Sequence, residues 1–133
     1  VSAALEFAVQ VLHVKHIVVM GHAQCGGVKA LTEESAPLSP GDFIGRWMSI
    51  IEPDPSKLKP HAGEAREAFV TRLEHAVIKR SLQNLMTFPC IRILVERGSL
   101  LLHGAYFGVA KGDLYVLDKA SGEFRNTQEV KGI

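Results

Sequence analysis

A histidine and a cysteine three positions apart, His22 and Cys25, are the residues of this chain best suited to chemistry. They follow the apolar run His16–Met20 and precede a glycine pair, which places them on a tight turn between a strand and a helix. Imidazole and thiolate groups are ligands that Zn²⁺ accepts, and this spacing lets both reach one ion. Two ligands do not complete a zinc site. The same pattern therefore also fits a buried cysteine and a surface histidine on an ordinary turn.

Glycines surround this pair of residues. Gly21 lets the backbone turn without a Cβ clash, whereas Gly26 and Gly27 allow a small anion to approach backbone N–H groups at a helix N-terminus. That helix terminus and a metal ion would each favour the thiolate form of Cys25. Because α/β sheets bind ligands beyond the carboxyl ends of their strands, the turn is a candidate site for a metal or an anion.

Apolar periodicity predicts the elements that must position this turn. The run His16–Met20 is typical of a strand buried on both faces, as in a parallel sheet. An amphipathic helix is predicted before it, because Val1, Leu5, Ala8, Val9 and Leu12 recur at the spacing of one helix face. Helices are predicted after it over Gly26–Leu31, Phe43–Ile51, Gly63–Met86 and Ile91–Glu96. His75, among charged residues of the longest helix, is expected to be exposed.

The C-terminal part of the sequence predicts a hairpin. Strands over Leu100–Val109 and Asp113–Leu117 flank the turn Ala110-Lys111-Gly112, and the polar tail Ser121–Ile133 is expected on the surface or on a partner. The fold class is therefore α/β, a mostly parallel sheet flanked by helices and ending in an antiparallel hairpin. So few strands suggest a missing N-terminal strand. Val1 begins inside a helical pattern without an initiator Met, so we expect that the natural N-terminus is missing.

Composition narrows the range of partners. The 133 residues carry 15 basic and 14 acidic side chains, a formal charge of +1, and no apolar run of membrane-spanning length. This balance argues against nucleic acid and membranes as partners. Two cysteines do not make a disulfide framework, so a reducing, cytoplasmic location is expected.

Several longer blocks, in order and with plausible spacing, carry a family resemblance. They are Leu5-Glu6-Phe7-Ala8-Val9, His16–His22 followed by Cys25-Gly26-Gly27-Val28, Phe43–Met48, Ser81–Leu85 and Leu102–Phe107. In these blocks the chain resembles the β-class carbonic anhydrases. The resemblance implies a β-carbonic-anhydrase-like fold. Residues 1–133 would form a single domain, the C-terminal part of such an enzyme, with the N-terminal helices and first strand absent.

The resemblance implies the reversible hydration of carbon dioxide to bicarbonate at a Zn²⁺ ion held by two cysteines and one histidine. His22 and Cys25 match the second and third of these ligands. The first cysteine and a catalytic Asp–Arg pair belong to a Cys-x-Asp-x-Arg segment, which this sequence does not contain. Cys90 follows Phe88-Pro89, does not match that segment, and is expected to be a small buried side chain. No catalytic residue is therefore assigned, and the chain as written is expected to be a poor enzyme.

Substrate contacts and assembly also follow from the resemblance. Phe7 matches a pocket position that is tyrosine in many plant-type members, where it would form an apolar wall for carbon dioxide; a core aromatic residue is an equal alternative. Gly26 and Gly27 complete the predicted substrate-binding set. The family assembles as dimers with the active site at the subunit boundary, so we expect a homodimer or higher homo-oligomer.

Two other functions remain open from the residues alone. The first is a non-catalytic metal- or anion-binding α/β module that uses the same turn. The second is thiol redox chemistry at Cys25, which is disfavoured because no resolving cysteine lies nearby in the sequence.

Overall fold

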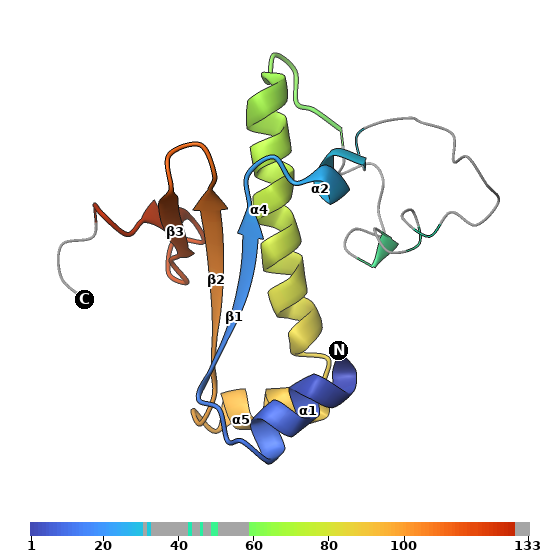
Figure 1. The fold of residues 1–133 in the computed structure, drawn as a ribbon, viewed down its shortest axis with the longest axis vertical. Helices are drawn as coiled ribbons and strands as arrows, with labels where there is room; N and C mark the ends of the chain where they lie inside the picture. Colours follow the sequence, from blue (N-terminus) through green and yellow to red (C-terminus); the bar gives the residue numbers. More distant parts are fainter. Residues whose placement is uncertain (31, 33–42, 44–45, 47–48, 51–58, 130–133) are drawn as a thin grey trace.

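The computed structural model describes residues 1–30, 32, 43, 46, 49–50 and 59–129. One strand lies between the N-terminal helices, three further strands follow the last helix, and the resulting four-stranded sheet packs against one long helix (Figure 1). In chain order the elements are α1 Ser2–Gln10, β1 His16–His22, α2 Gly26–Ala30, α4 Arg66–Leu85, α5 Pro89–Glu96, β2 Leu101–Gly108, β3 Asp113–Leu117 and β4 Phe124–Asn126. The α/β class and the closing hairpin are confirmed.

The sheet has the strand order β1-β2-β3-β4 and is mixed. β1 runs parallel to β2, with Val18 opposite His103, and the remaining neighbours are antiparallel. The described strands thus contain one parallel pair, fewer than a mostly parallel sheet would have. β4 lies in the tail that was expected on the surface; its three residues escape prediction because they are held by pairing with β3 rather than by an apolar pattern.

The helix α4 lies against β1 and β2 at very short range, because two glycines leave room for it. A Cβ atom on Gly21 would lie 2.8 Å from Cδ1 of Ile78, and one on Gly104 would lie 3.2 Å from Cγ2 of the same residue. Ile78 is fully buried at this contact. The glycine before His22 therefore serves helix–sheet packing as well as the turn.

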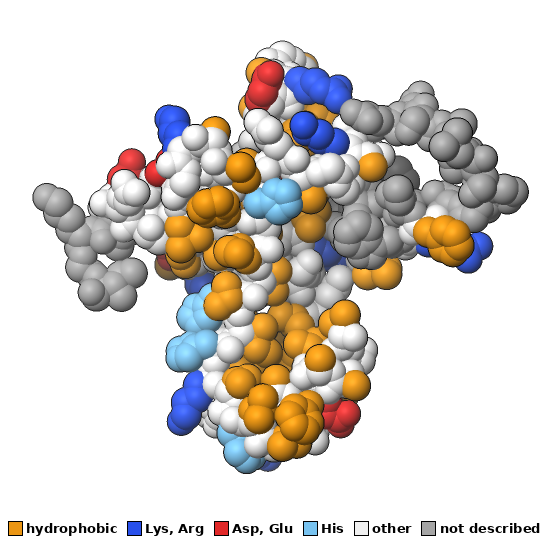
Figure 2. Space-filling model, in the orientation of Figure 1, with side chains coloured by type: hydrophobic (Ala, Val, Ile, Leu, Met, Phe, Trp, Pro, Cys, Tyr) orange, Lys and Arg blue, Asp and Glu red, His pale blue; other side chains and the backbone are white. Residues whose placement is uncertain are grey.

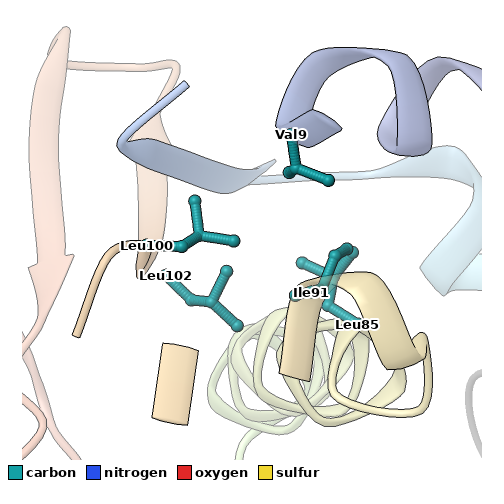
Figure 3. Close-up of a cluster of buried hydrophobic side chains, with 5 residues drawn as sticks. All are labelled: Val9, Leu85, Ile91, Leu100 and Leu102. Atoms are coloured by element: carbon teal, nitrogen blue, oxygen red, sulfur yellow. The ribbon is translucent and has the colours of Figure 1, made fainter. Parts of the chain in front are cut away.

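Two apolar clusters hold the helices to the sheet. The larger one joins α1, α5 and the end of α4 to the first residues of β2, and comprises Val9, Leu85, Ile91, Leu100 and Leu102 (Figure 3). The smaller one joins α2 to α4 through Val28, Phe69 and Leu73. The second cluster lies directly beneath the predicted turn, since Cys25 packs against it.

The expectation that β1 is buried on both faces is wrong for the described structure. Its side chains alternate in exposure, and Val18 and Met20 are 57% and 66% exposed. The physical reason is that α4 covers one face of β1, which is an edge strand of the described sheet. Figure 2 shows hydrophobic side chains gathered over the strands and the α1–α5 end.

The observed helices α4 and α5 begin at other residues than predicted, for reasons of local backbone conformation. The long helix begins at Arg66 rather than Gly63, because Gly63 has a positive φ of 75° and Ala65 is extended. α5 begins at Pro89, which suits the first turn of a helix. Most of the helix predicted over Phe43–Ile51 lies outside the described residues. No helix in the described part of the chain has the length and hydropathy that crossing a bilayer requires.

An ion pair fixes the segment that leads into α4. Glu64 accepts hydrogen bonds from Nε and Nη2 of Arg72, at 2.8 and 2.9 Å, and from the His61 backbone N–H at 2.8 Å. Arg72 also donates to the Lys59 carbonyl oxygen. The hydrogen bond from Arg72, more than the one from His61, lowers the pKa of Glu64 from 4.5 to about 2.

We predict that Gly21→Ala lowers the free energy of unfolding by about 1–3 kcal/mol, because the added methyl group overlaps Ile78. Gly26→Ala is the matched control, since nothing lies within 4 Å of a Cβ at that position. Ile78→Val, which removes Cδ1, should recover part of the loss in the Gly21→Ala background. Urea denaturation measures all four chains; equal losses at Gly21 and Gly26 would contradict the packing argument.

The Glu64 pair should also give a pH signature. A carboxylate whose folded pKa is about 2 instead of 4.5 stabilises the fold above pH 4.5, and this contribution disappears as the pH falls towards 2. Wild type should therefore melt above Glu64→Gln at pH 6, and the difference should shrink to a small remainder near pH 2. Glu67→Gln, an exposed carboxylate in the first turn of α4, is the control. A difference in melting temperature that is constant with pH would argue against this role of Glu64.

Candidate functional site

The predicted turn lies at the carboxyl end of β1, between His22 and the start of α2 at Gly26 (Figure 1). The Ala23 N–H donates to the Phe107 carbonyl oxygen at 2.9 Å, which ties the turn to the end of β2. Gln24 has a positive φ of 58°, a left-handed conformation that reverses the chain within three residues. Sheet pairing and one strained residue thus bring His22 and Cys25 onto a single turn.

The ring of His22 has a defined tautomer. Its Nδ1 atom lies 3.0 Å from the Ala23 carbonyl oxygen, which can only accept a hydrogen bond, so Nδ1 carries the proton. In the neutral ring Nε2 then carries the lone pair, and the side chain is exposed. This is the arrangement in which histidine binds a metal through one nitrogen and is oriented through the other.

Both the backbone N–H and the backbone carbonyl oxygen of Cys25 are hydrogen-bonded. Its backbone N–H donates to Oε1 of Glu74 at 2.9 Å, and its carbonyl oxygen accepts from the Lys29 N–H at 2.9 Å as α2 begins. The side chain is partly buried and packs against the cluster of Val28, Phe69 and Leu73. The backbone at Cys25 therefore has little freedom, unlike that of an ordinary exposed turn residue.

Glu74 and Tyr106 are site neighbours that the sequence analysis missed. Glu74 is 3% exposed, and its Oε2 accepts a hydrogen bond from the Tyr106 hydroxyl at 2.7 Å. Burial, followed by the hydrogen bond to Glu74 and its charge, raises the pKa of Tyr106 well above its usual range. One signal was present: Glu74 stands between Val70 and Ile78 at spacings of four, on the apolar face of α4.

His75 is not exposed as expected but packs among aromatic rings. Its ring centroid lies 4.5 Å from that of Tyr106 and 4.2 Å from that of Phe124. Burial, and then the charge of Lys79, lower its pKa. The unpredicted strand β4 supplies Phe124, which explains why the helix pattern alone misplaces this residue.

Two hollows flank Gln24 in the described structure. One of about 390 Å³ has several aromatic rings in its lining, among them those of His75, Tyr106 and Tyr115. The other, of about 380 Å³, is lined by Lys29, Glu74 and residues of the first turns of α4. Neither is lined by His22 or Cys25, so neither is the predicted metal position.

The remaining predicted residues lie apart from the pair. Gly26 and Gly27 open α2 beside Cys25, and a Cβ on Gly26 would have open space around it. Phe7 lies on α1, at the opposite end of β1 from the turn, and is 54% exposed (Figure 1). Cys90 lies in α5 and packs against the larger core cluster, as expected for a structural residue.

The donor set for a metal is incomplete within the described residues. They contain no group of three or more His, Cys, Asp or Glu side chains that could hold an ion. His22 and Cys25 offer an imidazole and a thiolate, which suit zinc, but a zinc site needs at least three protein ligands. The turn can therefore supply two ligands and no more on its own.

The sequence of this chain is similar to sequences of known proteins. Residues 1–114 match the family model described as "Carbonic anhydrase". Among curated relatives, beta carbonic anhydrase 3 of Arabidopsis thaliana is 35% identical over 123 residues, which cover 89% of this chain and 48% of that protein. The chain thus spans about half the length of this relative.

Solved structures agree in fold. The β-carbonic anhydrase CcaA superposes with a TM-score of 0.80 at 27% identity, covering 97% of this chain and 58% of that one. A tetrameric β-carbonic anhydrase from Sordaria macrospora gives a TM-score of 0.71 at 27% identity, covering 87% of this chain and 58% of that one. The mixed sheet and its flanking helices are therefore an arrangement known from solved proteins.

Proposed function

Because this chain belongs to the β-class carbonic anhydrase family, we propose that it serves the reversible hydration of carbon dioxide to bicarbonate, with His22 and Cys25 as ligands of a zinc ion. One observation carries the proposal. The turn after β1 carries both an imidazole and a thiol, and the Nδ1–H of the imidazole donates to the Ala23 carbonyl oxygen, which in the neutral ring leaves Nε2 free to bind a metal.

The residues fit zinc in kind. Thiolate and neutral imidazole are its usual protein ligands, and the carbonyl oxygen of Ala23 gives His22 the supporting hydrogen bond that metal-bound histidines normally have. When bound, zinc supplies a hydroxide nucleophile at neutral pH. The His22 ring is held in the ligating tautomer, and the open space at Gly26 leaves the backbone at the start of α2 accessible to a small substrate.

The number of protein ligands determines how tightly this chain is expected to bind zinc. The sequence has no Cys-x-Asp-x-Arg segment, so it provides neither the third ligand nor the Asp–Arg pair that the family resemblance implies. With one thiolate and one imidazole, the ion keeps positive charge and open positions. We therefore expect these 133 residues alone to bind zinc weakly and to hydrate carbon dioxide slowly.

Phe7 fits this proposal through a second copy of the chain. On its own chain it lies at the far end of β1 from the turn, and its ring is half exposed. In a homodimer with its active site at the subunit boundary, Phe7 of one copy would form the apolar wall beside His22 and Cys25 of the other. One of the similar solved structures is tetrameric, which supports a homo-oligomer.

A non-catalytic metal- or anion-binding module is the second candidate. The incomplete donor set among the described residues favours it, because two ligands can capture an ion without forming a catalytic site. The two candidates differ in one measurable property. A chain saturated with zinc that does not accelerate carbon dioxide hydration would support the module.

We predict that His22→Ala and Cys25→Ser each weaken zinc binding. Loss of a residue that only hydrogen-bonds to a metal ligand costs roughly 10–100-fold in affinity, and loss of a ligand itself should cost more. Cys90→Ser is the matched control and should bind zinc like wild type, because Cys90 packs in the core at α5. Competition with a chromophoric chelator measures the affinity, and stopped-flow acidification with a pH indicator measures hydration. Wild-type affinity in Cys25→Ser would refute the assignment of this ligand.

A further inference from the structure

We propose that Glu74 is a positioning residue for the metal-site cysteine: its buried carboxylate fixes the peptide of Cys25, and Tyr106 fixes the carboxylate. This inference rests on the proposed role of Cys25 as a zinc ligand. It assigns a function to a pair of residues that lie far from the turn in sequence.

The geometry connects three elements through one side chain. Oε1 of Glu74, on α4, accepts from the Cys25 N–H at 2.9 Å, and Oε2 accepts from the Tyr106 hydroxyl, on β2, at 2.7 Å. Both carboxylate oxygens are thus used. A carboxylate that bridges two partners in the interior can hold only one orientation.

The position of the bond explains its effect on the cysteine. It fixes the plane of the Gln24–Cys25 peptide, and this plane together with φ of Cys25 sets the direction in which the Cα–Cβ bond of Cys25 leaves the backbone. Gln24 is in the left-handed region, which a non-glycine residue adopts only when its surroundings hold it there. Glu74 supplies that constraint on the side of the turn that faces α4.

The burial of Glu74 argues against a purely incidental contact. It is the buried charged residue of the described structure, on a helix face otherwise occupied by Val70 and Ile78. Burying a carboxylate is unfavourable unless it is fully hydrogen-bonded, and an apolar side chain would fill the same space. The hydrogen bond to the Cys25 peptide is what an apolar residue could not provide.

Two conservative variants separate geometry from charge. Glu74→Gln keeps the side-chain length and an oxygen to accept the Cys25 N–H, while its amide can donate to the Tyr106 oxygen. Glu74→Asp keeps the charge but is too short to reach both partners. Positioning therefore predicts that Gln preserves the site and Asp damages it, whereas a role of the charge predicts the reverse.

The test uses the full chain in a Cys90→Ser background with Co²⁺ as the probe, so that thiolate-to-cobalt absorption reports on Cys25 alone. We expect Glu74→Asp to lose about 10–100-fold in Co²⁺ affinity and to weaken this absorption, with Glu74→Gln within a few-fold of the parent. Tyr106→Phe should fall between them, because the carboxylate loses one of its two partners. Glu67→Gln, an exposed carboxylate on the same helix, should change neither quantity.

Amide hydrogen exchange at Cys25 in the metal-free chain provides a readout that needs no metal. Exchange should be faster in Glu74→Asp than in the parent and unchanged in Glu74→Gln. Parent-like Co²⁺ affinity, absorption and exchange in folded Glu74→Asp would overturn the inference. If the parent chain binds no Co²⁺, the proposed metal function fails, and the exchange rates alone then decide whether Glu74 positions Cys25.

Discussion

The close approach of α4 to the β1–β2 pair sets both the packing of the core and the surroundings of the candidate site. It is possible because Gly21 and Gly104 present no Cβ to Ile78, so the helix packs almost directly on the strand backbones. Glu74 precedes Ile78 by one helical turn on the same face. The short distance that makes the core therefore also brings a carboxylate to the Cys25 peptide, and core packing and site geometry cannot vary independently.

Features set by local sequence were predictable. The long helix, the hairpin around Ala110-Lys111-Gly112 and the His22–Cys25 turn each follow from periodicity, turn residues or spacing within a few positions. Features set by distant partners were not. The exposure of Val18 depends on what covers β1, and the strand β4 exists because β3 offers it an edge. Nothing in the residues around either position encodes that partner.

The same division applies to the candidate site. His22 and Cys25 were found because their spacing along one turn is itself the signal, and the structure adds the tautomer of His22. Glu74 was missed because its partner, the Cys25 N–H, lies 49 positions away. Phe7 could be matched to a pocket position by resemblance, yet its chain places it at the other end of β1. Sequence reasoning identifies candidate ligands, whereas the residues that would orient them depend on the tertiary fold.

The proposed metal binding by His22 and Cys25 would couple metal binding to folding at this turn. An ion that binds only the folded arrangement of His22 and Cys25 stabilises that arrangement by mass action. The hydrogen bonds from the Cys25 N–H and from the Tyr106 hydroxyl to Glu74 would link this gain to α4 and β2. A site with few ligands depends strongly on this preorganisation, because each ligand that is already in place lowers the entropy lost on binding. The buried carboxylate thus matters most to the metal where the protein ligands are fewest.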